Sequence, residues 1–592
     1  MPNDSRLPDG RRDAARQLAE ELAADGLRTA RLAESLAVKT QPSEDFEQAL
    51  EAVEAAAAPQ GERCRVAFFG ESAAAGYLYA PEWTPAKALA EYLGGGVVDL
   101  SRTNETLAGF LRQLVAAPPA EIFVVFIGNN WELLETPEIS PYAPSTEARM
   151  RFAGLLRGDS WNGAARHAAQ TLAVKVRRTL DALARFATRY GSQVVLVIPE
   201  VNEEWAVLQP DVLRPLARQL PGPVEPDEES YHKMALLGSP RLTVAGRRLL
   251  NEAAKRHEWR SVDLREVFVQ HKLRDNEAFL DYCHLTSEGM RVAMKAVALA
   301  IQGEAGIANL APAPTLEALA YLGAAVHTAH RHPPTEGKKE LIVRRLQEAV
   351  AADPDVVDAF WDLVEARSTP LPAFLTAAQP RNLASPFRLG FQHGWRWDFV
   401  DADLVQAIGV VLAENGDPEA PAKIATRFAR FLAVGETGRE LAQAPFLWDP
   451  LERFYPEAMA FADLDERATL RSPLPWIRFC LVVAKPAEVL LKLTLRRPLP
   501  ADDSVVLKIN GESVAELPAC PTWQREQVRL PAATVREGLN ELEIRWPEIA
   551  GEALDGAYAT AVEDLALGRE TEMHPVYGEV AAITATVAAD EG

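Results

Sequence analysis

Several features that define other protein classes are scarce or absent in this sequence of 592 residues. Its four cysteines are widely separated and form no Cys-x-x-Cys pair, which argues against a disulfide framework and against a zinc site. No apolar run approaches the roughly 18 residues that a membrane span requires. The N-terminus lacks the basic-then-apolar order of a signal peptide. From these absences we expect a soluble, cytoplasmic protein that spans no membrane.

Basic residues are also under-represented, and the formal net charge is −22. Nucleic acids and anionic membrane surfaces both reward clustered Lys and Arg, so neither is expected as a main partner. No metal or cofactor motif is present, and we expect no cofactor. His327, His330 and His332 lie near prolines at what we expect to be an exposed helix end, without the acidic partners that would favour a metal site.

The chain is too long for one hydrophobic core and divides by its periodicity into four segments. Residues 1–63 are expected to be helical, and residues 64–303 alternate buried strands with helices. This alternation predicts a three-layer α/β domain with a doubly wound parallel sheet. The expected strands are Val66–Phe69, Val97–Leu100, Ile122–Ile127, Val194–Ile198 and Ser261–Asp263. The expected helices are Pro85–Leu93, Leu107–Val115, Ala164–Tyr190, Thr243–His257 and Ser287–Ile301.

Residues 304–460 are predicted to be helical, and Leu341–Ala366 resembles a tetratricopeptide-like hairpin. In residues 461–592 the period changes to two, with short strands separated by Pro and Asn-Gly turns. This pattern predicts an antiparallel β-sandwich that resembles the jelly-roll modules appended to carbohydrate-active enzymes. Thr584–Gly592 is expected to be a loose tail.

Three expected strands end in polar residues: Gly70-Glu71-Ser72, Gly128-Asn129-Asn130 and Pro199–Asn202. In open α/β sheets the ligand crevice lies beyond the carboxyl ends of the strands, so these residues should meet there. We expect a helix to begin at Ala73, which would place the Ser72 N–H at the positive end of a helix, where an oxyanion is stabilised. The alternative is that Ser72 is only a helix N-cap.

A second candidate motif, Asp281-Tyr-Cys-His284, precedes the last helix of the α/β segment. An aspartate three residues before a histidine can hold the Nδ1–H of the imidazole while Nε2 faces a serine hydroxyl. We therefore predict a catalytic triad in which Ser72 is the nucleophile, His284 the general base and Asp281 its orienting carboxylate. Gly-x-Ser-x-Gly is absent around Ser72, which disfavours the α/β-hydrolase family.

Together these motifs resemble those of the SGNH hydrolases, the GDSL-like esterase and acylhydrolase superfamily, and in particular members fused to tetratricopeptide-like helices. The resemblance covers residues 64–301. It implies an oxyanion hole made from the Ser72 N–H, the Asn130 amide and a backbone N–H from the second block. That block normally holds a glycine, whereas this chain has Asn104 or Thr103 at the approximate position.

Further residues near the strand ends are candidates for substrate binding: Gly128, Asn129, Trp131, Asn202 and Trp205. The insertion from Trp131 to Gly163, rich in Pro, Trp and Tyr, is expected to form a lid or pocket wall. The predicted substrate is a small-molecule or glycosylated ester. The predicted function is serine-dependent ester hydrolysis, with acyl transfer through the same Ser72 acyl-enzyme as one alternative. The other is a non-catalytic binding or scaffold protein that retains the fold.

Overall fold

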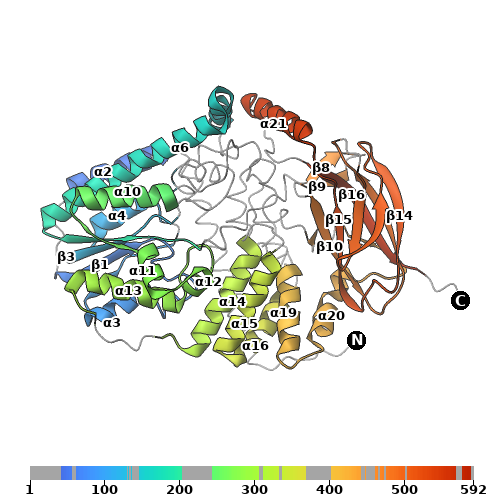
Figure 1. Ribbon diagram of the computed structural model, residues 1–592, viewed down its shortest axis with the longest axis horizontal. Helices are drawn as coiled ribbons and strands as arrows, with labels where there is room; N and C mark the ends of the chain where they lie inside the picture. Colours follow the sequence, from blue (N-terminus) through green and yellow to red (C-terminus); the bar gives the residue numbers. More distant parts are fainter. Residues whose placement is uncertain are drawn as a thin grey trace, which may run out of the picture.

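The computed structural model contains an α/β domain, a helical region and a pair of antiparallel sheets, arranged in that order along the chain (Figure 1). The helical region lies between the other two parts. The structure describes residues 42–56, 62–103, 105–129, 131, 135, 146–202, 243–305, 311–331, 337–367, 402–441, 447–448, 460–463, 467–472, 475–499, 503–568 and 576–588.

The α/β domain is built on a five-stranded sheet in the order β2-β1-β3-β4-β5, with every neighbouring pair parallel. The strands are β1 (Cys64–Gly70), β2 (Val97–Asp99), β3 (Ala120–Phe126), β4 (Gln193–Ile198) and β5 (Arg260–Asp263). All five strands predicted from the apolar runs are present. Gly70 pairs with Phe126 and Phe126 with Val197, so three strands end at one edge.

Helices cover both faces of this sheet, and each face has its own buried apolar cluster. On one face lie α3 (Pro85–Leu93), α11 (Leu264–His271) and α13 (Ser287–Gln302), and on the other α2 (Pro42–Ala55), α4 (Leu107–Ala116), α6 (Thr146–Tyr190) and α10 (Thr243–Arg256). Strand residues alternate between the two clusters, as the period of a strand requires: Phe68 faces one and Phe69 the other. This is a doubly wound α/β core.

One expectation for this domain was wrong. Helix α6 begins at Thr146 and not at Ala164, so much of the expected lid segment is helical. The last proline of that segment is Pro144, and no proline follows it up to Tyr190. The apolar pattern was obscured by Gly154, Gly158 and Gly163, each of which lowers helix propensity by about 1 kcal/mol without ending the helix.

The helical region consists of α14 (Pro314–Arg331), α15 (Lys338–Ala352), α16 (Val357–Arg367), α19 (Ala402–Glu414) and α20 (Ala420–Leu432). Helix α15 packs against both α14 and α19 around a third apolar cluster. The turn between α15 and α16 falls at Asp353-Pro354, within the segment Leu341–Ala366 that was predicted to form a helical hairpin. Helix α20 continues the packing onto strands of the next domain.

The C-terminal part contains two antiparallel sheets, in the orders β13-β12-β15-β10-β7 and β14-β11-β16-β9-β8, which enclose a common apolar cluster. The strands are β7 (Leu447–Trp448), β8 (Ala460–Asp463), β9 (Arg467–Ser472), β10 (Trp476–Val483), β11 (Val489–Arg496), β12 (Val505–Ile509), β13 (Glu512–Leu517), β14 (Gln524–Leu530), β15 (Gly538–Arg545) and β16 (Gly578–Val587). A further strand, β6 (Arg439–Glu440), pairs with β16.

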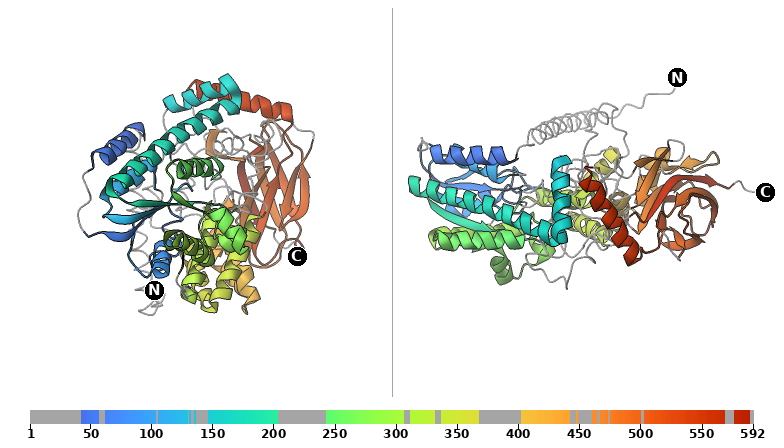
Figure 2. Two further views of the ribbon diagram at one scale, coloured as in Figure 1. Left: turned by 60° about the vertical axis from the view of Figure 1, so that its left-hand side comes forward. Right: turned by 90° about the horizontal axis from the view of Figure 1, so that it is seen from above.

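The expected loose tail was partly wrong, because Thr584–Val587 belongs to β16 and pairs with β11 near the middle of its sheet. The helix α21 (Gly551–Ala566) was not predicted either. It packs against α6 of the α/β domain (Figure 2). Arg157 on α6 forms an ion pair with Glu563 on α21 at 2.7 Å. The α/β part and the C-terminal part are therefore in direct contact. Within the described ranges, none of the helices combines the length and apolar character needed to cross a bilayer.

Candidate active site

The first part of the site is the turn that leaves β1. A Cβ atom on Gly70 would lie 2.4 Å from the carbonyl oxygen of Phe126, so only glycine allows β1 to end this close to β3. The chain then places Glu71 and Ser72 at the carboxyl edge of the sheet, where both side chains are buried. This edge is where the sequence places the candidate nucleophile.

The expected helix after Ser72 is absent. Ser72 lies in a run of turns in which the Ala75 N–H donates to the Glu71 carbonyl at 2.9 Å, and no α-helix follows before α3. Gly76 and Leu78 both have positive φ, which ends helical geometry within one turn. The helix-dipole argument for Ser72 was therefore wrong, and any oxyanion stabilisation there depends on local N–H groups.

The side chain of Glu71 supports the neighbouring strand end. It is buried, and its two carboxylate oxygens accept hydrogen bonds from the N–H groups of Gly128 and Asn129, at 2.9 and 3.0 Å. Gly128 has φ +117°, a conformation that L side chains rarely adopt. Glu71 thus fixes the loop after β3 relative to Ser72.

We expect Glu71→Gln to lower the free energy of unfolding by about 1–3 kcal/mol, because the amide places an NH2 group against a backbone N–H and leaves buried donors unpaired. Denaturant titration measures the change. The matched control is Glu47→Gln, which removes an exposed ion pair with Arg178 and should cost about 1 kcal/mol or less. Equal losses in the two variants would contradict the role assigned to Glu71.

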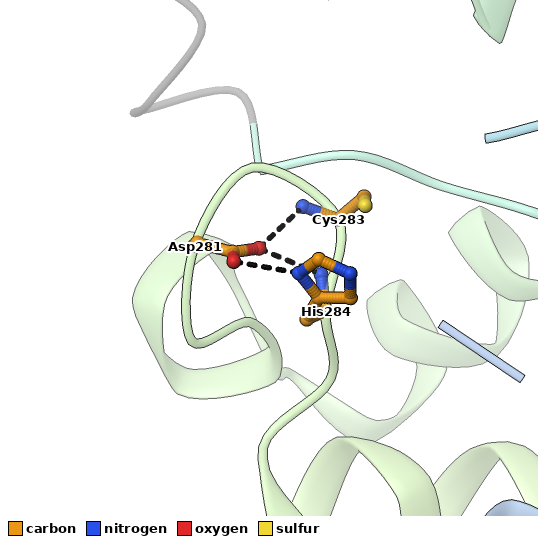
Figure 3. A group of neighbouring side chains, drawn as sticks. All are labelled: Asp281, Cys283 and His284. Carbon is orange, nitrogen blue, oxygen red and sulfur yellow. Dashed lines mark hydrogen bonds and ion pairs between the residues drawn. The ribbon is translucent and has the colours of Figure 1, made fainter. Parts of the chain in front are cut away.

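The second part of the site is the segment before α13. Asp281 Oδ1 accepts hydrogen bonds from the backbone N–H groups of Cys283, at 3.1 Å, and His284, at 2.9 Å. Its other oxygen, Oδ2, lies 2.6 Å from His284 Nδ1. Figure 3 shows the carboxylate directed at the imidazole, with the Cys283 side chain turned away from both. The four residues of the Asp-x-x-His motif therefore form one tight turn.

The two parts of the site meet at Ser72. Nε2 of His284 lies 2.8 Å from the Ser72 hydroxyl oxygen, although the residues are far apart in sequence. The exposed fractions of Ser72, His284 and Asp281 are 6, 3 and 0%. The structure thus brings the three predicted residues into one line of hydrogen-bond contacts with Asp281 at its buried end. This arrangement can move a proton from a serine hydroxyl to an imidazole.

The ionisation of Asp281 follows from its surroundings. Burial by itself raises the pKa of this carboxyl, but His284 and His327 together lower it by more, and the net pKa lies well below its ordinary value. Asp281 is therefore ionised throughout the neutral range. Its depressed pKa contributes stability that is present above the unfolded value near pH 4 and is lost as the pH falls towards the folded value.

Cys283 is the third member of a compact group with Asp281 and His284, whose side-chain donor atoms all lie within 4.8 Å of one another. Burial raises the pKa of its thiol well above the ordinary value, and the nearby Asp281 charge raises it further. Such a thiol stays protonated, which makes it a poor metal ligand and a poor nucleophile. Because both Asp281 and His284 are also engaged with each other, we assign no metal to this group.

The helical region contributes to the same site, which the sequence did not predict. His327 on α14 is buried, with 5% exposed, and its Nδ1 lies 2.6 Å from Asp281 Oδ2. The expectation of an exposed helix end was therefore wrong for His327. His330 belongs to α14, and His332 lies outside the described residues.

Arg345 on α15 also reaches the segment that carries Asp281 and His284. Its guanidinium is buried and donates to the Phe279 carbonyl and to the Asn276 side-chain oxygen, both at 2.7 Å. From the sheet side, Asn202 donates through its side-chain amide to the same Asn276 oxygen, at 3.0 Å, and to the Asp281 carbonyl, at 3.1 Å. The segment that carries Asp281 and His284 is therefore held both from the helical region and from the sheet side.

The remaining predicted residues fall into two groups. Trp131 is buried in an apolar cluster beside Gly128 and Gly246, a position that a packing role explains. Asn202 is buried in the contacts described above. The oxyanion and substrate-binding roles of Asn104, Asn130 and Trp205 stay predictions, because these three lie outside the described residues.

Two tyrosines flank the candidate base. The ring of Tyr77 lies 4.4 Å from that of His284, centroid to centroid, and the ring of Tyr282 lies 5.7 Å away. Both tyrosines are half-buried, so each packs on the imidazole while part of it faces solvent. These contacts restrict the orientations of the His284 ring.

No family model matches the chain, and neither does any curated protein. Solved structures do match. The lipase/acylhydrolase from Enterococcus faecalis is 13% identical with a TM-score of 0.24, and the match covers 42% of this chain and all of that one (100%). A GDSL-like lipase from Bacteroides thetaiotaomicron is 14% identical with a TM-score of 0.22, covering 44% and 97% of the two chains.

A family 35 carbohydrate binding module from Clostridium thermocellum is 11% identical with a TM-score of 0.13, covering 19% of this chain and 70% of that one. All of these TM-scores are below 0.5, so none of the three likenesses decides the function.

Proposed function

We propose that this chain is a serine-dependent carboxylic ester hydrolase of the SGNH type. The observation that carries the proposal is the contact between Ser72 Oγ and His284 Nε2 at 2.8 Å, together with the contact between His284 Nδ1 and Asp281 Oδ2 at 2.6 Å. A nucleophile in contact with a base that is itself oriented by a buried carboxylate is the arrangement that acyl transfer requires.

In the first half of the reaction, Ser72 Oγ attacks the ester carbonyl carbon while His284 Nε2 takes the hydroxyl proton. The tetrahedral intermediate collapses when the C–O bond to the leaving alcohol breaks, and His284 returns the proton to that alcohol. The product is an acyl ester of Ser72. Asp281 keeps the proton of His284 on Nδ1, so that Nε2 is the free acceptor.

In the second half, water replaces the alcohol. His284 Nε2 removes a proton from water as its oxygen attacks the acyl carbon, and the Ser72 oxygen leaves with the proton from His284. The carboxylic acid is released and the serine is restored. The Ser72 N–H, the Asn130 amide and the Asn104 N–H are proposed to stabilise the oxyanion in both halves, each donor contributing about 3 kcal/mol to the transition state.

The proposed substrate is an O-acyl ester of a small or glycosylated molecule. The helical region is proposed to be tetratricopeptide-like and the paired sheets to be a jelly-roll-like module. Acyl transfer is the alternative that uses the same acyl-enzyme, with an alcohol acceptor in place of water. Product analysis with and without an added alcohol distinguishes the two reactions.

A fluorophosphonate probe tests the proposal directly, because it phosphonylates only a serine that a neighbouring base activates. We expect labelling of the native protein and none of Ser72→Ala. Ser192→Ala is the matched control, since the Ser192 hydroxyl donates to the Ala120 carbonyl at the opposite end of the sheet, and it should label like the native protein. Equal labelling of native protein and Ser72→Ala would overturn the assignment, as would a native protein that neither labels nor hydrolyses esters.

A further inference from the structure

His327 shares the carboxylate of Asp281 with His284. Both Nδ1 atoms lie 2.6 Å from the same oxygen, Oδ2, and the two ring centroids are 5.9 Å apart. His327 and Asp281 are close enough to form an ion pair, but the His327 ring is not oriented for a well-directed N–H hydrogen bond to the carboxylate. The Ser-His-Asp arrangement thus continues to a fourth residue, which comes from a different domain.

Asp281, His284 and His327 are buried together, so their combined charge affects the free energy of the site. Asp281 has no exposed surface, and His284 and His327 are almost fully buried, so an uncompensated charge there would be strongly disfavoured. Asp281 is ionised, and His284 must be neutral in the resting enzyme if it is to accept the proton of Ser72. Among the described residues, the other imidazole in contact with the carboxylate is that of His327.

We infer that His327 is a positioning residue that carries the counter-charge of Asp281 as an imidazolium, leaving His284 neutral as the base. The inference builds on the proposed hydrolase function. In the resting site the Asp281 carboxylate and the His327 cation cancel. In the tetrahedral intermediate the His284 cation and the substrate oxyanion cancel as well. The group formed by Asp281, His284, His327 and the substrate then has no net charge at either stage, which avoids a desolvation cost at both.

Other groups near His327 act more weakly or carry no charge. Tyr77 and Tyr282 pack on its ring, at centroid distances of 5.5 and 6.5 Å, and Cys283 is a protonated thiol. On α15, the Lys338 ammonium donates to the Ala329 carbonyl, and its charge opposes protonation of His327. Asp281 is in direct contact with His327, so its attraction is the larger effect.

The His327 cation beside Asp281 makes it harder for His284 to take up a proton from solvent, because a second positive charge would then lie next to the first. Removing that cation should therefore let His284 protonate at higher pH. We expect His327→Gln to move the acid limb of the kcat/KM profile for p-nitrophenyl acetate upward by about one pH unit. On the plateau, kcat/KM should stay within about threefold of the native value, and well below the limb it should fall about tenfold.

His257→Gln is the matched control, because His257 Nε2 lies 2.9 Å from the Asp181 carboxylate, outside the site. It should leave the acid limb in place. If His327 only supported packing, His327→Gln would lower activity equally at every pH, and an unmoved limb would overturn the inference. If Ser72→Ala hydrolysed the ester as well as the native protein, the proposed function would be overturned instead. The role of His327 in that reaction would then be overturned too.

The protonation states can also be measured directly in the native protein. Heteronuclear NMR of the histidine rings distinguishes a doubly protonated ring from a neutral one. At the pH of the activity plateau we expect His284 neutral and His327 doubly protonated, with His327→Gln used for assignment. Two neutral rings at that pH would overturn the inference even if the hydrolase activity is present.

Discussion

Replacing His284 with alanine is expected to lower kcat for ester hydrolysis by about 10⁴- to 10⁶-fold. The reason is that Ser72 Oγ loses the only acceptor assigned to it, the Nε2 atom 2.8 Å away, and a serine hydroxyl is a weak nucleophile without a base. The measurement is kcat on p-nitrophenyl acetate, with Ser72→Ala as the background. Labelling by the fluorophosphonate should slow in parallel, because it depends on the same proton transfer.

The matched control is His257→Ala, which also removes a histidine bonded to a carboxylate but lies outside the site. Its kcat should equal that of the native protein. Thermal unfolding shows whether each variant is folded at the assay temperature. A folded His284→Ala variant with kcat within tenfold of native would contradict the assignment of His284 as the base.

Asp281→Asn is expected to lower kcat by about 10⁴-fold through the proton position on His284. The N–H groups of Cys283 and His284 both point at Oδ1, so the side-chain oxygen of the asparagine must take that position. Its NH2 group is then directed at His284 Nδ1, which must become an acceptor. The ring proton moves to Nε2, where it faces the Ser72 hydroxyl and prevents it from donating.

Kinetics and NMR check this result together. The kcat of Asp281→Asn should fall while KM changes little, and the neutral His284 ring should carry its proton on Nε2. Asp181→Asn, which alters the partner of His257, is the matched control and should retain native kcat. Loss of activity with the proton still on Nδ1 would show that Asp281 acts by some means other than orienting the base.

The sequence predicted the parts of the structure that local patterns determine. The five parallel strands are short apolar runs bounded by glycine or polar residues, and β1 through β5 are close to their predicted positions. Ser72, Asp281 and His284 could be grouped because parallel strands end at a common edge and because a turn brings Asp281 and His284 together. For these residues the relevant information is local.

The contributions of the helical region could not be predicted in the same way. His327 and Arg345 lie on helices whose patterns indicate only amphipathic packing, and nothing local marks either side chain as a partner of the α/β domain. Their contacts with Asp281 and Phe279 depend on how two domains dock. In the structure both side chains are buried, which would have marked them as functional candidates. Burial cannot be read from a single sequence.

The turn after Ser72 was mispredicted for a related reason. Three alanines favour a helix, but Gly76 and Leu78 adopt positive φ, and the segment is held by tertiary contacts such as the buried ring of Tyr79. Tertiary packing outweighs a propensity of a few tenths of a kcal/mol per residue.

The attachment of His327 and Arg345 to the catalytic segment also has a consequence for synthesis. Domains generally fold in the order in which they leave the ribosome, starting from the N-terminus. The α/β domain therefore emerges complete with Ser72, Asp281 and His284 while α14 and α15 are still to be made. Until Arg345 has emerged, the nascent chain holds Ser72, Asp281 and His284 without the contacts that His327 and Arg345 of the helical region provide. Full assembly of the site is thus delayed until translation has passed beyond the domain that contains it.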